Sequence, residues 1–193
     1  MKPKQLPNSG VATEMMNNKR AMKVANLSVE TFYGLLDSAI VGRLCVQAWL
    51  GHGDAMFLGL GGEVSPPPTP CSSPTGISYL RHHQPDYELQ TYSSDWILRD
   101  GDTIRASSFD DPKAREGCTS LLGLKALAWH FLHPSWGISV TFDSGILFEV
   151  LPYKDGRDAD SDAWGLRGPG GLYSIIRLNG ECYTVPGDQP AGT

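Results

Sequence analysis

The hydrophobic pattern of the chain changes from a helical period to a period of two near residue 42. In 26–42, NLSVETFYGLLDSAIVG, apolar side chains recur at helical spacing. The positions on the shared face are Phe32, Leu35, Leu36 and Ile40. Ser28 can cap the first turn, and Gly42 suits the end of the helix. The pattern predicts one N-terminal helix over 28–40, which we expect to cover an open face or edge of a sheet.

From residue 43 onwards, alternating apolar and polar residues predict antiparallel hairpins. The clearest is 138–150, ISVTFDSGILFEV, where a three-residue turn ending at Gly145 would pair Val140 with Phe148. One face of this hairpin is then wholly apolar, which fixes its register against a buried core.

A second hairpin is predicted over 173–185, where a two-residue turn at Asn179 and Gly180 would pair Ile176 with Tyr183. Other stretches with strand-like content are 43–50, 55–60, 87–98 and 124–132. The polar segment between the last two is compatible with one short helix.

A short sequence motif occurs twice. Residues 96–99 read WILR and residues 164–167 read WGLR, each after Ser and Asp and each before a turn. Other features that recur in the same order are Gly42 with Gly123, and Ala48-Trp49 with Ala128-Trp129. The order of these features predicts two related antiparallel β units, 41–105 and 122–185, that share one core.

The predicted fold class is α+β, mainly β, with an internal pseudo-duplication and one N-terminal helix. We expect a single globular domain over 26–185, a flexible tail at 1–25 and a frayed end at 186–193. The prolines of 62–76 remove backbone donors, so this segment is expected to form a surface loop in the first unit.

The repeated tryptophans and arginines allow two interpretations. Trp96 and Trp164, on strands beside turns, are expected to pack in the core rather than in an interface. Arg99 and Arg167 lie near hairpin ends, where they can pair with nearby aspartates such as Asp95, Asp100 and Asp162. Alternatively, the two arginines are binding residues for a partner protein.

The charge of the chain is uneven. The net charge is −5, and residues 1–25 carry five lysines and arginines against one glutamate, a local +4 that leaves −9 on the remainder. An acidic body argues against nucleic-acid binding and for a protein partner with a basic surface. No stretch approaches the ~20 apolar residues of a membrane span, and no membrane partner is expected.

The four cysteines show no paired metal-ligand spacing. The N-terminus has no apolar secretory region, so we expect a cytoplasmic protein whose cysteines are thiols. Cys45 and Cys182 lie in strand-like runs and are expected to be small buried hydrophobes.

The densest acidic stretch is DGRDADSDAW, which holds Asp155, Asp158, Asp160 and Asp162. Its D-x-D-x-D portion resembles the start of a calcium loop, but Ala163 and Pro169 occupy positions that such a loop requires as Gly and Glu. We therefore assign no metal and no cofactor. Together with Arg99 and Arg167, these carboxylates are the candidate binding residues, as a surface that would attract a basic partner.

Two alternative functions remain. A small hydrolase or metal-dependent enzyme would use His82, His83 and Asp86 with the 155–162 carboxylates, although no nucleophile elbow or phosphate-binding loop accompanies them. A structural subunit of a larger assembly would use the basic tail at 1–25 to reach another chain.

Segments of both units resemble a pattern in small uncharacterised bacterial proteins. The segments are VGRLCVQAWLGHGDAMFLGLG (41–61), LLGLKALAWHFLHPSWGISVTFDSGILFEVLPY (121–153) and DAWGLRGPGG (162–171). Such proteins look like immunity or defence-accessory proteins, so the resemblance implies a non-catalytic module that binds a protein partner. It supplies no catalytic residues.

Overall fold

The computed structural model describes residues 25–51, 55–62, 85–109, 111–153 and 158–187. Its first half contains β1 (Ala25–Asn26), α1 (Val29–Ile40), β2 (Cys45–Leu50), β3 (Met56–Leu60), β4 (Tyr87–Thr91), β5 (Ser94–Asp100) and β6 (Thr103–Ser107). Its second half contains α3 (Asp111–Ser120), β7 (Ala126–Leu132), β8 (Gly137–Phe142), β9 (Ile146–Pro152), β10 (Asp162–Arg167), β11 (Leu172–Arg177) and β12 (Cys182–Pro186). The fold class is α+β and mainly β, as predicted.

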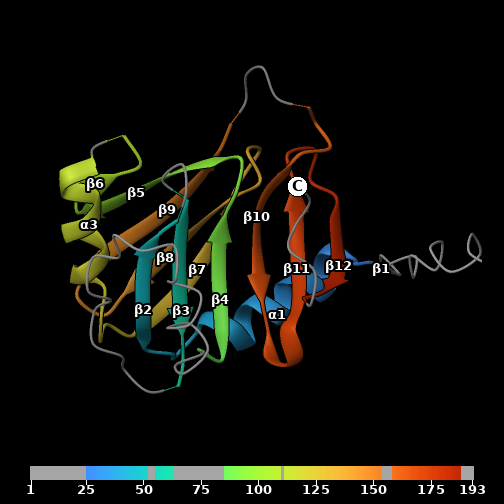
Figure 1. The fold of residues 1–193 in the computed structure, drawn as a ribbon, viewed down its shortest axis with the longest axis horizontal. Helices are drawn as coiled ribbons and strands as arrows, with labels where there is room; N and C mark the ends of the chain where they lie inside the picture. Colours follow the sequence, from blue (N-terminus) through green and yellow to red (C-terminus); the bar gives the residue numbers. More distant parts are fainter. Residues whose placement is uncertain (1–24, 52–54, 63–84, 110, 154–157, 188–193) are drawn as a thin grey trace, which may run out of the picture.

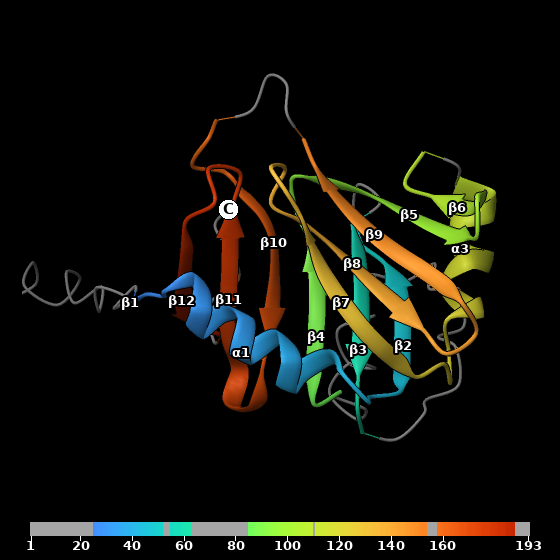
Figure 2. The ribbon, with the colours of Figure 1, turned by 180° about the vertical axis from the view of Figure 1, so that it is seen from behind.

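The strands form two antiparallel sheets that face each other as two layers (Figures 1 and 2). The seven-stranded sheet has the order β1-β12-β11-β10-β4-β3-β2, and the five-stranded sheet has the order β6-β5-β9-β8-β7. The side chains between them form one core, and its largest members are Trp96 and Trp164, both fully buried. The Trp164 indole N–H donates to the Trp136 carbonyl at 2.7 Å. The core placement of both tryptophans is thus confirmed.

Each half of the chain contributes to both sheets. The meander β2-β3-β4 of the first half joins β10 and β11 of the second half in the seven-stranded sheet. The meander β7-β8-β9 of the second half joins β5 and β6 of the first half in the five-stranded sheet. The halves have therefore exchanged their closing strands, so neither half could complete a sheet from its own strands.

Strand register confirms that the halves are related. Trp96 lies opposite Val150 of β9, and two residues later Leu98 lies opposite Phe148. Trp164 lies opposite Thr91 of β4, and two residues later Leu166 lies opposite Leu89. The pairs β5·β9 and β10·β4 are thus equivalent, with the repeated tryptophans at matching positions.

The halves meet at a two-stranded connection, 41–45 and 122–126, which we call the axial ribbon. The Gly42 N–H donates to the Ala126 carbonyl, and the Gly123 N–H donates to the Cys45 carbonyl, each at 2.8 Å. Both glycines have φ of 80°, in the left-handed region that favours glycine. These matching bonds place a pseudo-two-fold axis at the ribbon.

The centre of the axial ribbon is the isolated bridge between Leu44 and Lys125. The other recurring pair does not obey this symmetry. Ala48 lies opposite Leu58, whereas Trp129, not Ala128, occupies the equivalent place opposite Val140. The alignment of the two Ala-Trp pairs is therefore wrong by one residue, since the second pair comes one residue nearer to its glycine.

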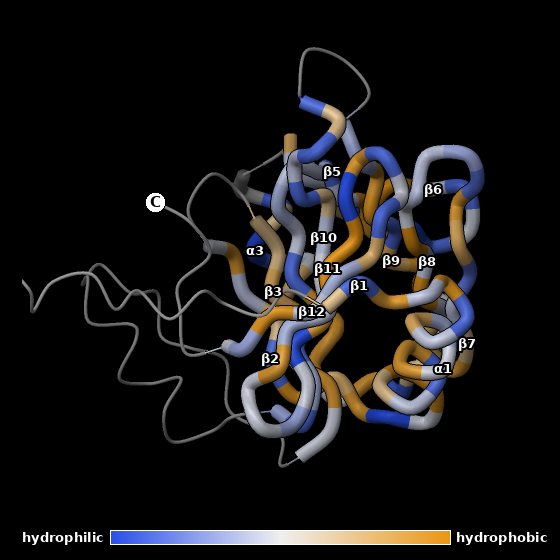
Figure 3. Tube along the Cα trace, turned by 90° about the vertical axis from the view of Figure 1, so that its right-hand side faces the viewer, coloured by the Kyte–Doolittle hydropathy of each residue, from blue (hydrophilic) through white to orange (hydrophobic). Residues whose placement is uncertain are grey.

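Two helices complete the layers. The N-cap of α1 is Ser28, whose hydroxyl accepts from the Thr31 N–H at 3.1 Å. Helix α1 lies beside β7, and Figure 3 shows hydrophobic positions on both elements. Phe32 on its inner face contacts the Trp164 ring with centroids 5.5 Å apart. A second helix, α3, packs on β2 and β6 and lies in the polar segment whose sequence was compatible with one short helix.

The two clearest hairpins differ in how well the sequence predicted them. Val140 pairs with Phe148, as expected. In the other hairpin Ile176 pairs with Cys182 instead of Tyr183. The Arg177 N–H donates to the Glu181 carbonyl at 2.9 Å, which closes a turn of three residues rather than two. That single extra residue in the turn shifts the whole pairing by one position.

Candidate functional site

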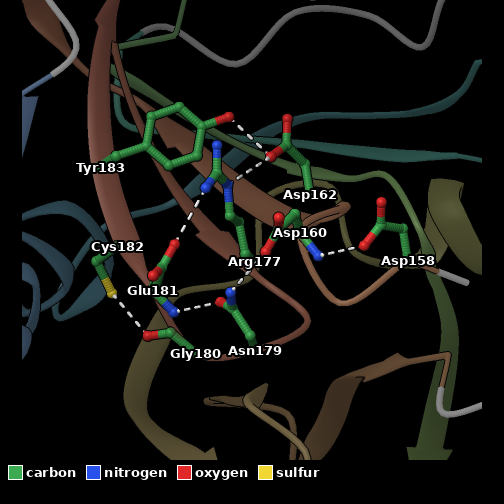
Figure 4. A network of polar contacts seen from close by, with 9 residues as sticks. All are labelled: Asp158, Asp160, Asp162, Arg177, Asn179, Gly180, Glu181, Cys182 and Tyr183. Atoms are coloured by element: carbon green, nitrogen blue, oxygen red, sulfur yellow. Dashed lines mark hydrogen bonds and ion pairs between the residues drawn. The ribbon is translucent and has the colours of Figure 1, made fainter.

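The acidic stretch before β10 is joined to the turn between β11 and β12 (Figure 4). Asp162 Oδ1 accepts from the Tyr183 hydroxyl at 2.7 Å and lies 3.9 Å from Arg177 Nε. Burial, followed by this hydrogen bond, raises the pKa of Tyr183 to about 12. Asp162 is thus engaged inside the protein.

The neighbouring aspartates make similar internal contacts. Asp160 Oδ1 accepts from the Asn179 side-chain amide at 3.0 Å, and Asp158 Oδ1 accepts from the Asp160 N–H at 3.2 Å. The backbone adds a bond from the Leu178 N–H to the Ser161 carbonyl at 2.9 Å. These contacts give the described aspartates a structural role, and Asp155 lies outside the described residues.

Arg99 lies on the outer face of the five-stranded sheet, because it alternates with the buried Trp96 and Leu98. Its Nε lies 2.6 Å from Glu149 Oε2 on β9. The expected pairing with Asp95 or Asp100 is wrong, since Asp95 accepts from Ser108 and Asp100 pairs with Arg105. Arg99 therefore pairs with a residue on the adjacent strand and the same face of the sheet, and not with the aspartates near it in sequence.

Arg167 lies on the outer face of the seven-stranded sheet and alternates with the buried Leu166. Its guanidinium carbon is 5.9 Å from the centre of the Tyr173 ring. Within the described chain the guanidinium makes no hydrogen bond and no ion pair. Arg99 and Arg167 point away from opposite sheets, so the predicted binding residues do not form one site.

A cavity of about 200 Å³ adjoins Arg167. Its lining residues are Pro85, Asp86, Glu88, Arg167 and the turn 168–171. Glu88 is 4% exposed, and burial raises the pKa of its carboxyl above the ordinary value. The Gln90 side-chain amide donates to Glu88 Oε1, and the Tyr92 hydroxyl donates to Gln90 Oε1 at 2.8 Å.

Sequence reasoning missed Glu88 and Gln90, although a signal was present. In YELQTY both residues fall on one side of a strand, opposite Leu89. Period two identifies the shared face, but only the pairing of β4 with β10 places Arg167 opposite Glu88.

The residues of the enzyme alternative do not gather where they can be described. His82 and His83 lie outside the described residues. Asp86 pairs with Arg43, with Nη1 and Oδ2 2.8 Å apart. Asp86 lies just before the start of β4. Asp162 lies near the other end of β4, where its carbonyl accepts from the Ser93 N–H. The length of the strand separates these carboxyl groups by about 20 Å, too far for one proton-transfer site.

Three exposed aliphatic side chains lie on the axial ribbon or one residue beyond it. Val41, Leu44 and Leu127 are 47%, 41% and 50% exposed, and we call them the axial patch. Leu44 lies opposite Lys125, and Leu127 follows Lys125 by two residues, at the bulge between Ala126 and Ala128. Val41 lies next to them, because the Gly42 N–H is bonded across the ribbon.

The described part of the chain has three further properties. It holds no group of three or more histidine, cysteine or acidic side chains that could bind a metal ion. Neither of its helices has the length and apolar content needed to cross a membrane. Cys45 and Cys182 are buried, at 0% and 5% exposure, as expected, and both are free thiols.

Comparison with protein-family models, curated proteins and solved structures gave no match.

Proposed function

We propose that this chain is a non-catalytic cytoplasmic protein-binding module whose partner docks on the axial patch. The observation that carries the proposal is the set of three aliphatic side chains that stay 41–50% exposed on the axial ribbon or next to it. Scattered exposed apolar residues are ordinary, but adjacent ones with a polar border are typical of interaction sites.

The border of the patch suggests the charge of the partner. Asp37 lies one turn before Val41, and the Asp143 N–H donates to the Lys125 carbonyl at 2.9 Å. Both aspartates are exposed, as is Lys125. Two carboxylates around an apolar centre support a partner with a basic surface, which would gain association rate from their field.

A role of the immunity or defence-accessory kind is the specific form of this proposal. It is supported by the resemblance of 41–61, 121–153 and 162–171, which include both strands of the axial ribbon.

The test is co-purification from the native host at low and high salt, with matched variants. Leu44→Asp and Leu127→Asp place charges in the patch. Ile104→Asp and Leu172→Asp are controls, because these side chains are 51% and 47% exposed on other strands. We expect the patch variants to lose a partner that the controls retain, with all four variants folded by circular dichroism. No partner with the wild type at either salt concentration, or equal loss in the controls, would contradict the proposal.

A further inference from the structure

The pseudo-two-fold relation makes Arg99 and Arg167 equivalent residues. Arg99 follows Trp96 by three residues on β5, and Arg167 follows Trp164 by three residues on β10. Each arginine points outward from its sheet. The neighbouring strand is β9 for Arg99 and β4 for Arg167. A difference between their surroundings is therefore a difference between matched positions.

The neighbouring strand supplies a carboxylate bonded to the arginine in only one of the two cases, although Glu88 of β4 lies opposite Arg167. Glu149 lies opposite Ile97, one residue after Trp96, and pairs with Arg99 at 2.6 Å. The equivalent residue opposite Gly165 is Gln90, which is neutral. Gln90 is already bonded to Glu88 and Tyr92 through its side chain. Within the described residues, the Arg167 guanidinium therefore keeps N–H donors that are not bonded, although Glu88 lies near enough to interact with its charge.

The cavity beside Arg167 is also accessible from one side. Its wall at 168–171 is the turn GPGG, which carries few side-chain atoms. A Cβ atom built on Gly170 would meet no other atom within 4 Å. The turn therefore leaves open space at Gly170 on the wall of the cavity.

We propose that the Arg167 cavity binds a carboxylate group, from a small organic acid or from the end of a peptide chain. A guanidinium presents paired N–H donors that match the two oxygens of a carboxylate. This proposal does not depend on the proposed function, because Arg167 and the turn 168–171 belong to neither strand of the axial ribbon.

The second carboxyl of the cavity favours this ligand when it is protonated. Glu88 accepts from Gln90 at Oε1, so a protonated Oε2 can donate to a bound carboxylate. The groups that face Glu88 are Arg167 from β10, Asp86 and Gln90 from its own segment, and Gly59 from β3, which has no side chain. Asp86 is neutralised by its pair with Arg43.

The test is a titration of the full ¹⁵N-labelled chain with sodium acetate at constant ionic strength, followed through the amide resonances of Gly168, Gly170 and Gly171. We expect a saturable shift that Arg167→Gln weakens at least about tenfold, since charged hydrogen bonds are lost. Arg99→Gln is the matched control and should leave the affinity for acetate unchanged.

Two further probes identify the source of the carboxylate. Acetyl-Ala-Ala-Ala with a free C-terminus is compared with the same peptide amidated. Binding of acetate alone assigns a small acid, and binding of the free peptide but not its amide assigns a chain end. The proposal is overturned by an equal shift with sodium chloride, by no saturable shift with either probe, or by equal weakening in Arg99→Gln.

Discussion

The first and second halves of the chain place the same core residues in matching register, but they differ on the outer faces of the sheets. Trp96 and Trp164 are both fully buried, and the glycines that open both halves have the same φ. In contrast, Arg99 is paired with Glu149, whereas Arg167 makes no ion pair within the described residues and has the buried Glu88 opposite it. The interior constrained both copies through packing, whereas the surface, where substitutions cost little, was free to diverge.

The largest effect is expected when the shared core is broken. Trp164→Ala and Trp96→Ala should each lower the free energy of unfolding by about 3–5 kcal/mol, because each removes a fully buried indole. Urea denaturation followed by circular dichroism measures both values. Similar losses would support matching roles, while a loss below about 1 kcal/mol in either would show that the two tryptophans are not equivalent.

A pair of turn glycines gives an intermediate effect. Gly145 and Gly180 have φ of 84° and 87°. Alanine at Gly145 meets no atom within 4 Å, so only backbone strain of about 1 kcal/mol is expected. Alanine at Gly180 would also overlap the Trp136 indole, and its cost in unfolding free energy should be clearly larger. Equal melting temperatures for the two variants would contradict the position of Trp136.

The arginine comparison is expected to give a smaller effect on stability. Arg99→Gln removes a half-exposed ion pair with Glu149, so it should cost up to about 1 kcal/mol. Arg167→Gln removes no such pair and should be nearly neutral in chemical denaturation. A larger loss for Arg167→Gln would show that this residue has a structural partner.

A carboxylate added beside Arg167 tests the difference between the two arginines from the other direction. Gln90→Glu introduces a carboxylate at the position that Glu149 occupies in the other half, so Arg167 gains an internal partner. Acetate affinity should then fall as it does in Arg167→Gln, with the fold retained. Unchanged affinity would mean that the guanidinium is not the group that receives acetate.

The smallest effect concerns pH and Glu88. Its folded-state pKa is raised above the ordinary value of 4.5, chiefly by burial. The stability that the protonated form contributes is therefore complete below that ordinary value and is lost as pH rises through the raised pKa. Glu88→Gln remains neutral, so its unfolding free energy relative to the wild type should increase between pH 4 and pH 8. A difference that is constant with pH, measured by urea denaturation, would contradict the raised pKa.

The sequence predicted the local features of this fold better than its long-range strand pairing. The repeated WILR and WGLR predicted the duplication, and alternation predicted the pairing of Val140 with Phe148. Neither pattern contains the information that β5 leaves its own half for β9, because strand exchange depends on contacts far apart in sequence.

The candidate site was harder to predict for the same reason. Dense carboxylates at 155–162 were the strongest local signal, yet the described ones serve the β11–β12 turn. The cavity brings Arg167 to Glu88 only through the register of β10 on β4. A one-residue error in register, such as the one made for Ile176, turns the wrong side chains outward.

The doubled arrangement is tested most directly by hydrogen-bond scalar couplings across the axial ribbon in a uniformly ¹³C,¹⁵N-labelled sample. The account predicts couplings from the Gly42 nitrogen to the Ala126 carbonyl carbon and from the Gly123 nitrogen to the Cys45 carbonyl carbon. Both should be observed, with comparable size and slow amide exchange. If one glycine amide lacked its coupling and exchanged freely with solvent, the two halves would not be related by the axis described.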